Sequence, residues 1–271
     1  MLISAVLNVV PESLASIPPG QGAALESVFF AWLSRLDPAY AAELHAMQDK
    51  PFTISDLRPA CPPQKDAPAG LLWWRITSLS PRLSTLLVEQ MLPALPPVLE
   101  LENCGGALRS VSYTLDSGEH PWACRSSYEE LIRQVLLSPQ KPGSALDLHF
   151  LTPTAFHQDG KQMLFPLPGN VFESWLRRWN AFAPAGLPAE VRALAEQWVA
   201  VSRYRLNSSR LRSEGGVELG FSGFCRYRIL TPDPYWLRVL HTLAAYSFFC
   251  ATGRKTARGM GQTRVVRCGS S

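Results

Sequence analysis

This 271-residue chain lacks paired cysteines and long uninterrupted apolar runs. It also lacks the glycine motifs of common nucleotide-binding proteins. Its six cysteines show no Cys-x-x-Cys pair and no regular spacing, which argues against a disulfide framework or a metal site and favours a reducing compartment. The apolar run over residues 236–252 contains Arg238 and His241 and is too short to span a membrane. The apolar first ten residues have no basic stretch of the kind that opens a signal peptide. We therefore expect a cytoplasmic protein that does not associate with a membrane.

Charged residues are few, at 18%, and they are unevenly distributed. Residues 201–271 contain twelve Arg or Lys against three acidic residues, a net charge of +9, whereas residues 1–200 have a net charge of −5. Eleven of the twelve cations are arginine, whose planar guanidinium suits bidentate phosphate contacts and stacking on bases. A nearly neutral chain with one strongly basic end predicts that this end meets nucleic acid.

A glycine-rich basic segment over residues 252–265 is the most distinctive part of the sequence. Glycines in such a loop let a ligand approach the main chain, and the surrounding cations attract a polyanion. The residues that we predict to bind RNA in this loop are Gly253, Arg254, Lys255, Arg258, Gly259 and Gly261. The loop lacks the Gly-Lys-Ser/Thr of a P-loop and the spacing of a dinucleotide-binding loop. The alternative is a helix C-cap at Gly253 followed by a solvated basic turn.

Hydrophobic periodicity predicts an α+β fold that repeats one plan twice. In the first half we predict strands at 1–10, 51–55, 71–77, 98–101 and 108–115, and helices at 24–36, 38–45 and 83–92. In the second half we predict strands at 146–151, 217–221, 224–230 and 262–266, and helices at 171–182, 190–203 and 234–252. A turn at Ser222-Gly223 is expected to join two of those strands. The plan is typical of two tandem ferredoxin-like (RRM-like βαββαβ) domains with antiparallel sheets, at 1–120 and 121–271.

Candidate catalytic residues lie near the end of the second predicted helix. RNA cleavage by its own 2′-hydroxyl needs a base for that proton, an acid for the departing 5′ oxygen and a cation beside the phosphate. His45 is suited to either proton transfer near neutral pH, and Lys50, five residues later, to the third role. Tyr40 either assists His45 or is an ordinary core or surface tyrosine. The alternative is that His45 is an ordinary cap or surface residue, since spacing alone does not decide.

Four motifs in the right order carry a resemblance to a known family. They are Lys-Pro-Phe-Thr-Ile-Ser at 50–55 after a helix-end histidine, Phe-Leu-Thr-Pro-Thr-Ala-Phe at 150–156, Pro-Leu-Pro at 166–168 with Val171-Phe172, and the terminal Gly-x₅-Gly-x-Gly. Together they resemble the CRISPR-associated repeat-RNA endoribonucleases of the repeat-associated mysterious protein superfamily. The resemblance extends from about residue 1 to residue 266.

This resemblance implies two tandem ferredoxin-like domains and cleavage of the precursor CRISPR transcript within each repeat. It implies that no metal or other cofactor is needed and that the products end in a 2′,3′-cyclic phosphate and a 5′-hydroxyl. By position it assigns the catalytic histidine to His45 and the family's lysine to Lys50, and the glycine loop supports the RNA. The first helix offers Phe29, Phe30 and Trp32 where some members have a tyrosine.

RNA is the expected partner, and the sequence leaves several alternatives open. A second cluster, Arg203, Arg205, Arg210 and Arg212, either grips RNA or forms a solvated hairpin. The chain is an endoribonuclease, a non-catalytic RNA-binding subunit of a CRISPR effector complex, or a nucleotide-binding regulator. Contacts with other effector subunits and a homodimer are both compatible with the sequence.

Overall fold

The computed structural model describes residues 1–13, 21–59, 68–101, 106–158, 160–213 and 216–266, without the side chains of residues 211–213 and 216. Its contacts divide the chain into two units, each made of stretches that are distant in sequence. Unit 1 comprises Met1–Arg125, Arg212–Gly216 and Ala257–Gly259. Unit 2 comprises Ser126–Leu211, Val217–Thr256 and Met260–Ser271. The short stretch Ala257–Gly259 therefore carries part of the glycine-rich segment into unit 1.

The sheet of unit 1 is antiparallel and has the strand order β2-β4-β1-β6-β5, while β3 pairs with β4 and β7 with β1. Its strands are β1 (Leu2–Pro11), β2 (Phe52–Ile54), β3 (Arg58–Pro59), β4 (Leu72–Ser78), β5 (Val98–Leu101), β6 (Gly106–Thr114) and β7 (Cys124–Ser126). Its helices are α1 (Gly22–Leu36), α2 (Pro38–Ala46) and α3 (Pro81–Leu86), which continues as the π-helical turn η2 (Leu87–Met91). This order is that of a ferredoxin-like fold with β5 added at the edge.

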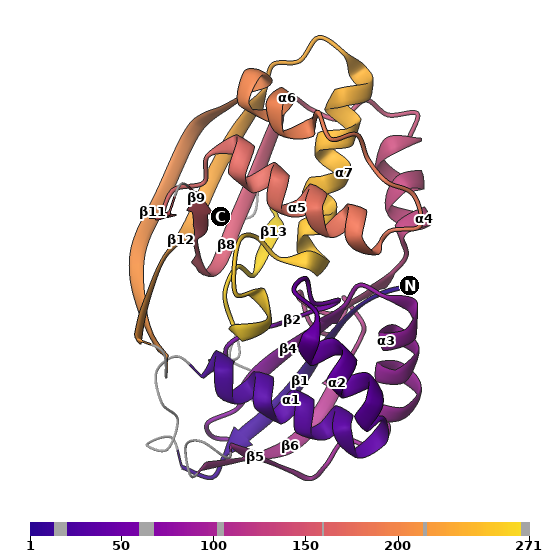
Figure 1. Cartoon of the computed structure of the whole chain (residues 1–271), viewed down its shortest axis with the longest axis vertical. Helices are drawn as coiled ribbons and strands as arrows, with labels where there is room; N and C mark the ends of the chain where they lie inside the picture. Colours follow the sequence, from indigo (N-terminus) through magenta and orange to yellow (C-terminus); the bar gives the residue numbers. More distant parts are fainter. Residues whose placement is uncertain (14–20, 60–67, 102–105, 159, 214–215, 267–271) are drawn as a thin grey trace. The chain divides into compact units, whose positions relative to one another are not determined.

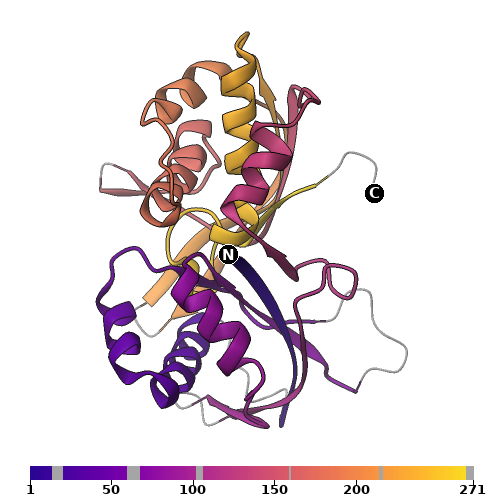
Figure 2. The same ribbon diagram turned by 90° about the vertical axis from the view of Figure 1, so that its right-hand side faces the viewer.

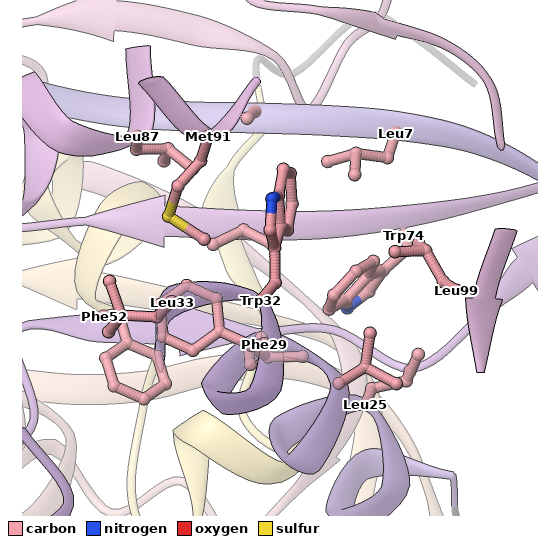
Figure 3. Packing of buried hydrophobic residues seen from close by; sticks show 14 of the residues in the cluster. Leu7, Leu25, Phe29, Trp32, Leu33, Phe52, Trp74, Leu87, Met91 and Leu99 are labelled. Atoms are coloured by element: carbon pink, nitrogen blue, oxygen red, sulfur yellow. The ribbon is translucent and has the colours of Figure 1, made fainter. Parts of the chain in front are cut away.

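The core of unit 1 lies between the helices and one face of this sheet (Figures 1 and 2). Alternate residues of β1, from Ile3 to Val9, point into it because successive side chains of a strand face opposite sides. From α1 come Leu25, Phe29 and Trp32 at helical spacing, and Figure 3 shows them packed with Trp74 of β4. The helices are thereby fixed against the sheet, which sets the direction of α2.

Asp37 separates α1 from α2 and sets where α2 begins. Its side chain accepts a 2.9 Å hydrogen bond from the backbone N–H of Tyr40, and Pro38 occupies the first helical position. This N-cap agrees with the helix start that the sequence predicted at residue 38.

The sheet of unit 2 is also antiparallel, with the order β11-β12-β8-β13, and α5 and α7 lie against one face of it (Figure 1). The strands of this sheet are β8 (Ala145–Thr154), β11 (Val199–Ser213), β12 (Gly216–Ile229) and β13 (Thr263–Val265), and two further strands are β9 (Phe156–Gln158) and β10 (Lys161–Met163). The helices of unit 2 are α4 (Tyr128–Leu131), η3 (Ile132–Leu136), α5 (Pro168–Phe182), α6 (Val191–Trp198) and α7 (Pro234–Cys250), while the short η4 (Thr256–Arg258) begins in unit 2 and ends in unit 1. The small β9–β10 hairpin stands apart from the main sheet. The predicted α+β class with antiparallel sheets in tandem ferredoxin-like domains is confirmed.

Two predicted elements of unit 2 are wrong. The helix expected over 190–203 ends at Trp198, and the chain continues directly as β11. The turn expected at Ser222-Gly223 does not exist, because β12 runs through it as one strand. Gly223, at φ +128°, instead marks a register shift where β12 pairs with β8. A glycine within a strand is typical of such a bulge.

Candidate active site

His45 lies in the last turn of α2 with its side chain exposed. The edge of its ring meets the half-buried ring of Phe30 from α1, with the ring centroids 5.2 Å apart. Phe30 in turn contacts Phe52 of β2, so that the core of unit 1 supports the histidine from one side. An exposed imidazole at the end of a fixed helix is well placed to transfer protons to or from a bound molecule.

Lys50 closes the end of α2. Its ammonium donates hydrogen bonds to the carbonyl oxygens of Leu44 (3.0 Å), His45 (3.0 Å) and Met47 (3.3 Å). The last carbonyls of a helix have no partner within the helix, and a lysine ammonium has three N–H groups to offer. Burial lowers the pKa of Lys50, the carboxylate of Glu26 opposes that effect, and the guanidinium of Arg258 adds to it. The structure therefore brings Lys50 to the backbone of His45.

Tyr40 lies in the core of unit 1, away from His45. Its side chain is only 3% exposed, and the guanidinium of Arg82 covers its ring at 3.7 Å from the centroid. Burial raises the pKa of Tyr40, which a hydrogen bond with Ser80 partly offsets. Five residues on a helix correspond to a rotation of roughly 140°, so Tyr40 and His45 project from different sides of α2. The aromatic residue that the structure places beside His45 is Phe30, which has no hydroxyl group.

Arg258 and Gly259, from the third stretch of unit 1, contact α1 and β2. The Nε of Arg258 donates to Oε2 of Glu26 at 2.6 Å, and the N–H of Gly259 donates to the carbonyl of Ile54 at 3.1 Å. The side chain of Glu26 is 9% exposed and that of Arg258 is 52% exposed. Gly22 permits this contact, since a Cβ there would lie 1.9 Å from the carbonyl oxygen of Arg258.

Glu26 and Phe30 are one turn apart on α1 and so share a face of that helix. Phe30 contacts His45, and Glu26 binds Arg258. The ammonium of Lys50 also lies 5.7 Å from the centre of the Phe30 ring. A histidine and two cations are thus gathered around one stripe of α1. The sequence argument missed Glu26, although a carboxylate among the apolar residues of a helix face was a signal.

Side chains of α5 form hydrogen bonds with the part of the glycine-rich loop that belongs to unit 2. Ser174 accepts the N–H of Gly253 at 3.2 Å, the indole of Trp175 donates to Thr252 Oγ1 at 2.8 Å, and Arg178 donates to the carbonyl of Cys250 at 2.8 Å. Arg178 also contacts Thr256. One face of α5 thereby fixes the loop along its first half.

The backbone amides of Gly253, Arg254, Gly259 and Gly261 are bonded within the protein, which corrects the argument that the amides at these glycines are open to a polyanion. The N–H of Arg254 donates to Ala155 at 3.0 Å and the N–H of Gly261 to Pro153 at 3.0 Å. Gly261 is buried at φ +76°, and a Cβ on it would lie 2.1 Å from the carbonyl oxygen of Thr252. The glycines allow tight packing and left-handed backbone, while the side chains of the cations remain for a ligand.

Those cations differ in what they contact. Lys255 forms an ion pair with Glu218, whose pKa that ammonium lowers. Arg254 is half-buried, whereas Arg258 is exposed. On β11 the side chains of Arg203, Arg205 and Arg210 are exposed, while the side chain of Arg212 lies outside the described part of the structure.

Two other features are absent from the described residues. Within that part of the chain, no group of three or more His, Cys, Asp or Glu residues gathers where it could hold a metal ion. No helix there is both long enough and apolar enough to cross a membrane.

Comparison with known proteins shows which family these features resemble. A family model for the CRISPR-associated endoribonuclease Cas6 matches residues 148–263, which include the glycine-rich loop. The product complex of a Thermus thermophilus Cas6 (TTHB231) superposes over 98% of this chain and all of its own, with 28% identity and a TM-score of 0.84. The family that this chain resembles is Cas6. The resemblance expected from the sequence is thereby confirmed.

Further Cas6 proteins match less of the chain or less closely. A second solved structure, a Cas6 (TTHA0078) product complex, covers 98% of this chain and 99% of its own, with 25% identity and a TM-score of 0.79. The Cas6 of Mycobacterium tuberculosis (strain CDC 1551 / Oshkosh) is 30% identical over 120 residues. That match covers 44% of this chain and spans 38% of the length of the relative. His45 and Lys50 lie outside the stretch matched by the Cas6 family model, so their roles rest on the geometry described above.

Proposed function

We propose that this chain is an endoribonuclease that binds precursor CRISPR RNA and cleaves it within each repeat. The likeness to Cas6 structures over nearly the whole chain supports the class of activity. The observation that carries the proposal is the exposed imidazole of His45, fixed at a helix end. Lys50 is hydrogen-bonded to the carbonyl of His45, and Arg258 is bound to Glu26 on the stripe of α1 that carries Phe30. Such a site has the groups that an RNA phosphodiester needs for internal cleavage.

The reaction that suits these groups needs no metal ion. The 2′ oxygen forms a bond to phosphorus while the bond from phosphorus to the 5′ oxygen breaks. One proton leaves the 2′-hydroxyl and one reaches the 5′ oxygen, which gives a 2′,3′-cyclic phosphate and a 5′-hydroxyl. His45 transfers one of these protons, and an imidazole is suited to either role near neutral pH.

The basic side chains of unit 2 supply an RNA-binding surface. Arg203, Arg205 and Arg210 project into solvent from β11, and arginine forms bidentate contacts with phosphates. Arg254 and Lys255 of the glycine-rich loop add further positive charge. The proposed roles of these side chains predict binding that weakens steeply with salt.

The test is cleavage of end-labelled repeat RNA in EDTA by the wild-type protein and by His45→Ala. We expect one discrete cut by the wild type, a rate at least 100-fold lower in His45→Ala, and no cut when the attacking ribose lacks its 2′-hydroxyl. His157→Ala is the matched control, since His157 is another exposed histidine, on β9 in unit 2. RNA binding without cleavage by the wild type would favour an RNA-binding subunit, and full activity of His45→Ala would exclude His45.

A further inference from the structure

Lys50 has no N–H group left for a phosphate. The ammonium has three donors, and three carbonyl oxygens at the end of α2 accept from it at 3.0 to 3.3 Å. Turning it toward an RNA phosphate would leave those carbonyls without partners at the point where His45 is attached. A lysine bonded in this way holds the helix end in place.

Arg258 has the donors that Lys50 lacks. Its Nε is bound to Glu26, and within the described part of the chain its two terminal nitrogens make no hydrogen bond. They belong to a side chain that is 52% exposed, while its anchor Glu26 is 9% exposed. A guanidinium held by Nε keeps the pair of terminal nitrogens that matches two phosphate oxygens.

The backbone fixes where Arg258 stands. Ser55 and Gly259 form a parallel bridge, and the Gly259 N–H is bonded to Ile54 at the end of β2. Gly22, at the start of α1, lies directly against the carbonyl of Arg258. The guanidinium is therefore fixed on the same stripe of α1 that carries Phe30, which contacts both His45 and Lys50.

We propose that Arg258 is the cation that contacts the scissile phosphate, and that Lys50 is a positioning residue that fixes the helix end bearing His45. This assignment rests on the proposed endoribonuclease function and moves to Arg258 the role beside the phosphate that the sequence gave to Lys50. Negative charge grows on the non-bridging oxygens of the phosphate as the 2′ oxygen attacks, and a preorganised guanidinium stabilises it. Glu26 keeps Arg258 oriented between turnovers.

The experiment measures single-turnover cleavage of repeat RNA that contains either a normal phosphate or a phosphorothioate at the cut site. Sulfur in place of a non-bridging oxygen weakens a hydrogen bond to that atom, so the slowing it causes reports a direct contact. We expect Arg258→Met to lower the rate about 100-fold with less than a tenfold change in Kd. Sulfur should slow the wild type and Lys50→Met by the same factor but should add nothing in Arg258→Met, because the partner is already gone.

Conservative variants separate positioning from contact. Lys50→Arg keeps donors for the helix carbonyls and should recover most of the rate lost in Lys50→Met. Arg258→Lys keeps the charge without the paired nitrogens and should recover little. Arg192→Met controls for loss of an arginine from a surface ion pair, since Arg192 pairs with Glu173 and Glu196 on unit 2. Urea unfolding of each variant confirms that it is folded.

The outcomes separate this assignment from the proposed function. A sulfur effect that disappears in Lys50→Met and persists in Arg258→Met would overturn the assignment and leave the endoribonuclease standing. Absence of any cleavage by the wild type would overturn both.

Discussion

Asp56 offers a test of the site through stability alone. It follows β2 and lies against the loop, where a Cβ on Gly259 would come within 2.0 Å of its Oδ1. Within the described residues, that oxygen is buried without a hydrogen-bond partner. Burial raises the pKa of Asp56 from its ordinary value of 3.8 to about 6, against the opposing charge of Arg58. Ionised Asp56 therefore destabilises the folded protein at neutral pH.

The size of the effect follows from the shift in pKa. Each unit corresponds to about 1.4 kcal/mol, so a shift of about two units makes the folded state about 3 kcal/mol less stable once Asp56 is fully ionised. Because the pKa is raised on folding, the stabilising contribution is complete below about pH 4 and is lost as the pH rises to about 6. Asp56→Asn has no charge to bury. Its advantage over the wild type should grow from about 1 kcal/mol at pH 4.5 to about 3 kcal/mol at pH 7.5.

Urea unfolding followed by tryptophan fluorescence at pH 4.5, 6.0 and 7.5 measures this difference. Glu119→Gln is the control, because Glu119 is an exposed carboxylate in the same unit and its replacement should change stability little at any pH. An advantage of Asp56→Asn that is the same at all three pH values, or that falls as the pH rises, would refute the reasoning.

Three further changes test other parts of the structure. Gly261→Ala should lower the free energy of unfolding in a urea titration by about 2 kcal/mol or more, since its φ is +76° and the new Cβ meets the Thr252 carbonyl. Gly143→Ala is the control, because its Cβ enters open space and should lower the free energy of unfolding far less. Trp175→Phe removes the hydrogen bond to Thr252 Oγ1 and should cost about 1 kcal/mol by thermal unfolding; an unchanged Tm would show that α5 does not hold the loop through it. Arg205→Gln should reduce the slope of log Kd for repeat RNA against log salt by about 0.7 to 0.9, and an unchanged slope would exclude a phosphate contact.

Local patterns in the sequence were enough to predict most of the fold. Asp37 and Asp233 both accept a backbone N–H immediately before the helices that the sequence predicted to begin at residues 38 and 234. The strand β11 was missed because its charged residues are exposed along an edge of the sheet and show no apolar alternation. What makes it a strand is pairing with β12, which a local pattern does not contain.

The candidate site was predictable only in part. His45 and Lys50 are five residues apart, so the sequence could place them together, but the direction of the Lys50 ammonium depends on how the chain turns after α2. The ion pair of Arg258 with Glu26 joins residues 232 positions apart. The glycines of the loop adopt left-handed backbone, as Gly259 does at φ +86°. Two of their amides donate hydrogen bonds to carbonyl groups of strands that are distant in sequence, which a local pattern does not reveal.

The division of unit 1 among three stretches of chain has a consequence for biogenesis. As the ribosome releases the polypeptide, Met1–Arg125 emerges early with Glu26 and the end of β2 still lacking their partners. Those partners arrive with Ala257–Gly259, after nearly all of unit 2 has been translated. The site in a nascent chain therefore stays incomplete until Ala257–Gly259 has been translated.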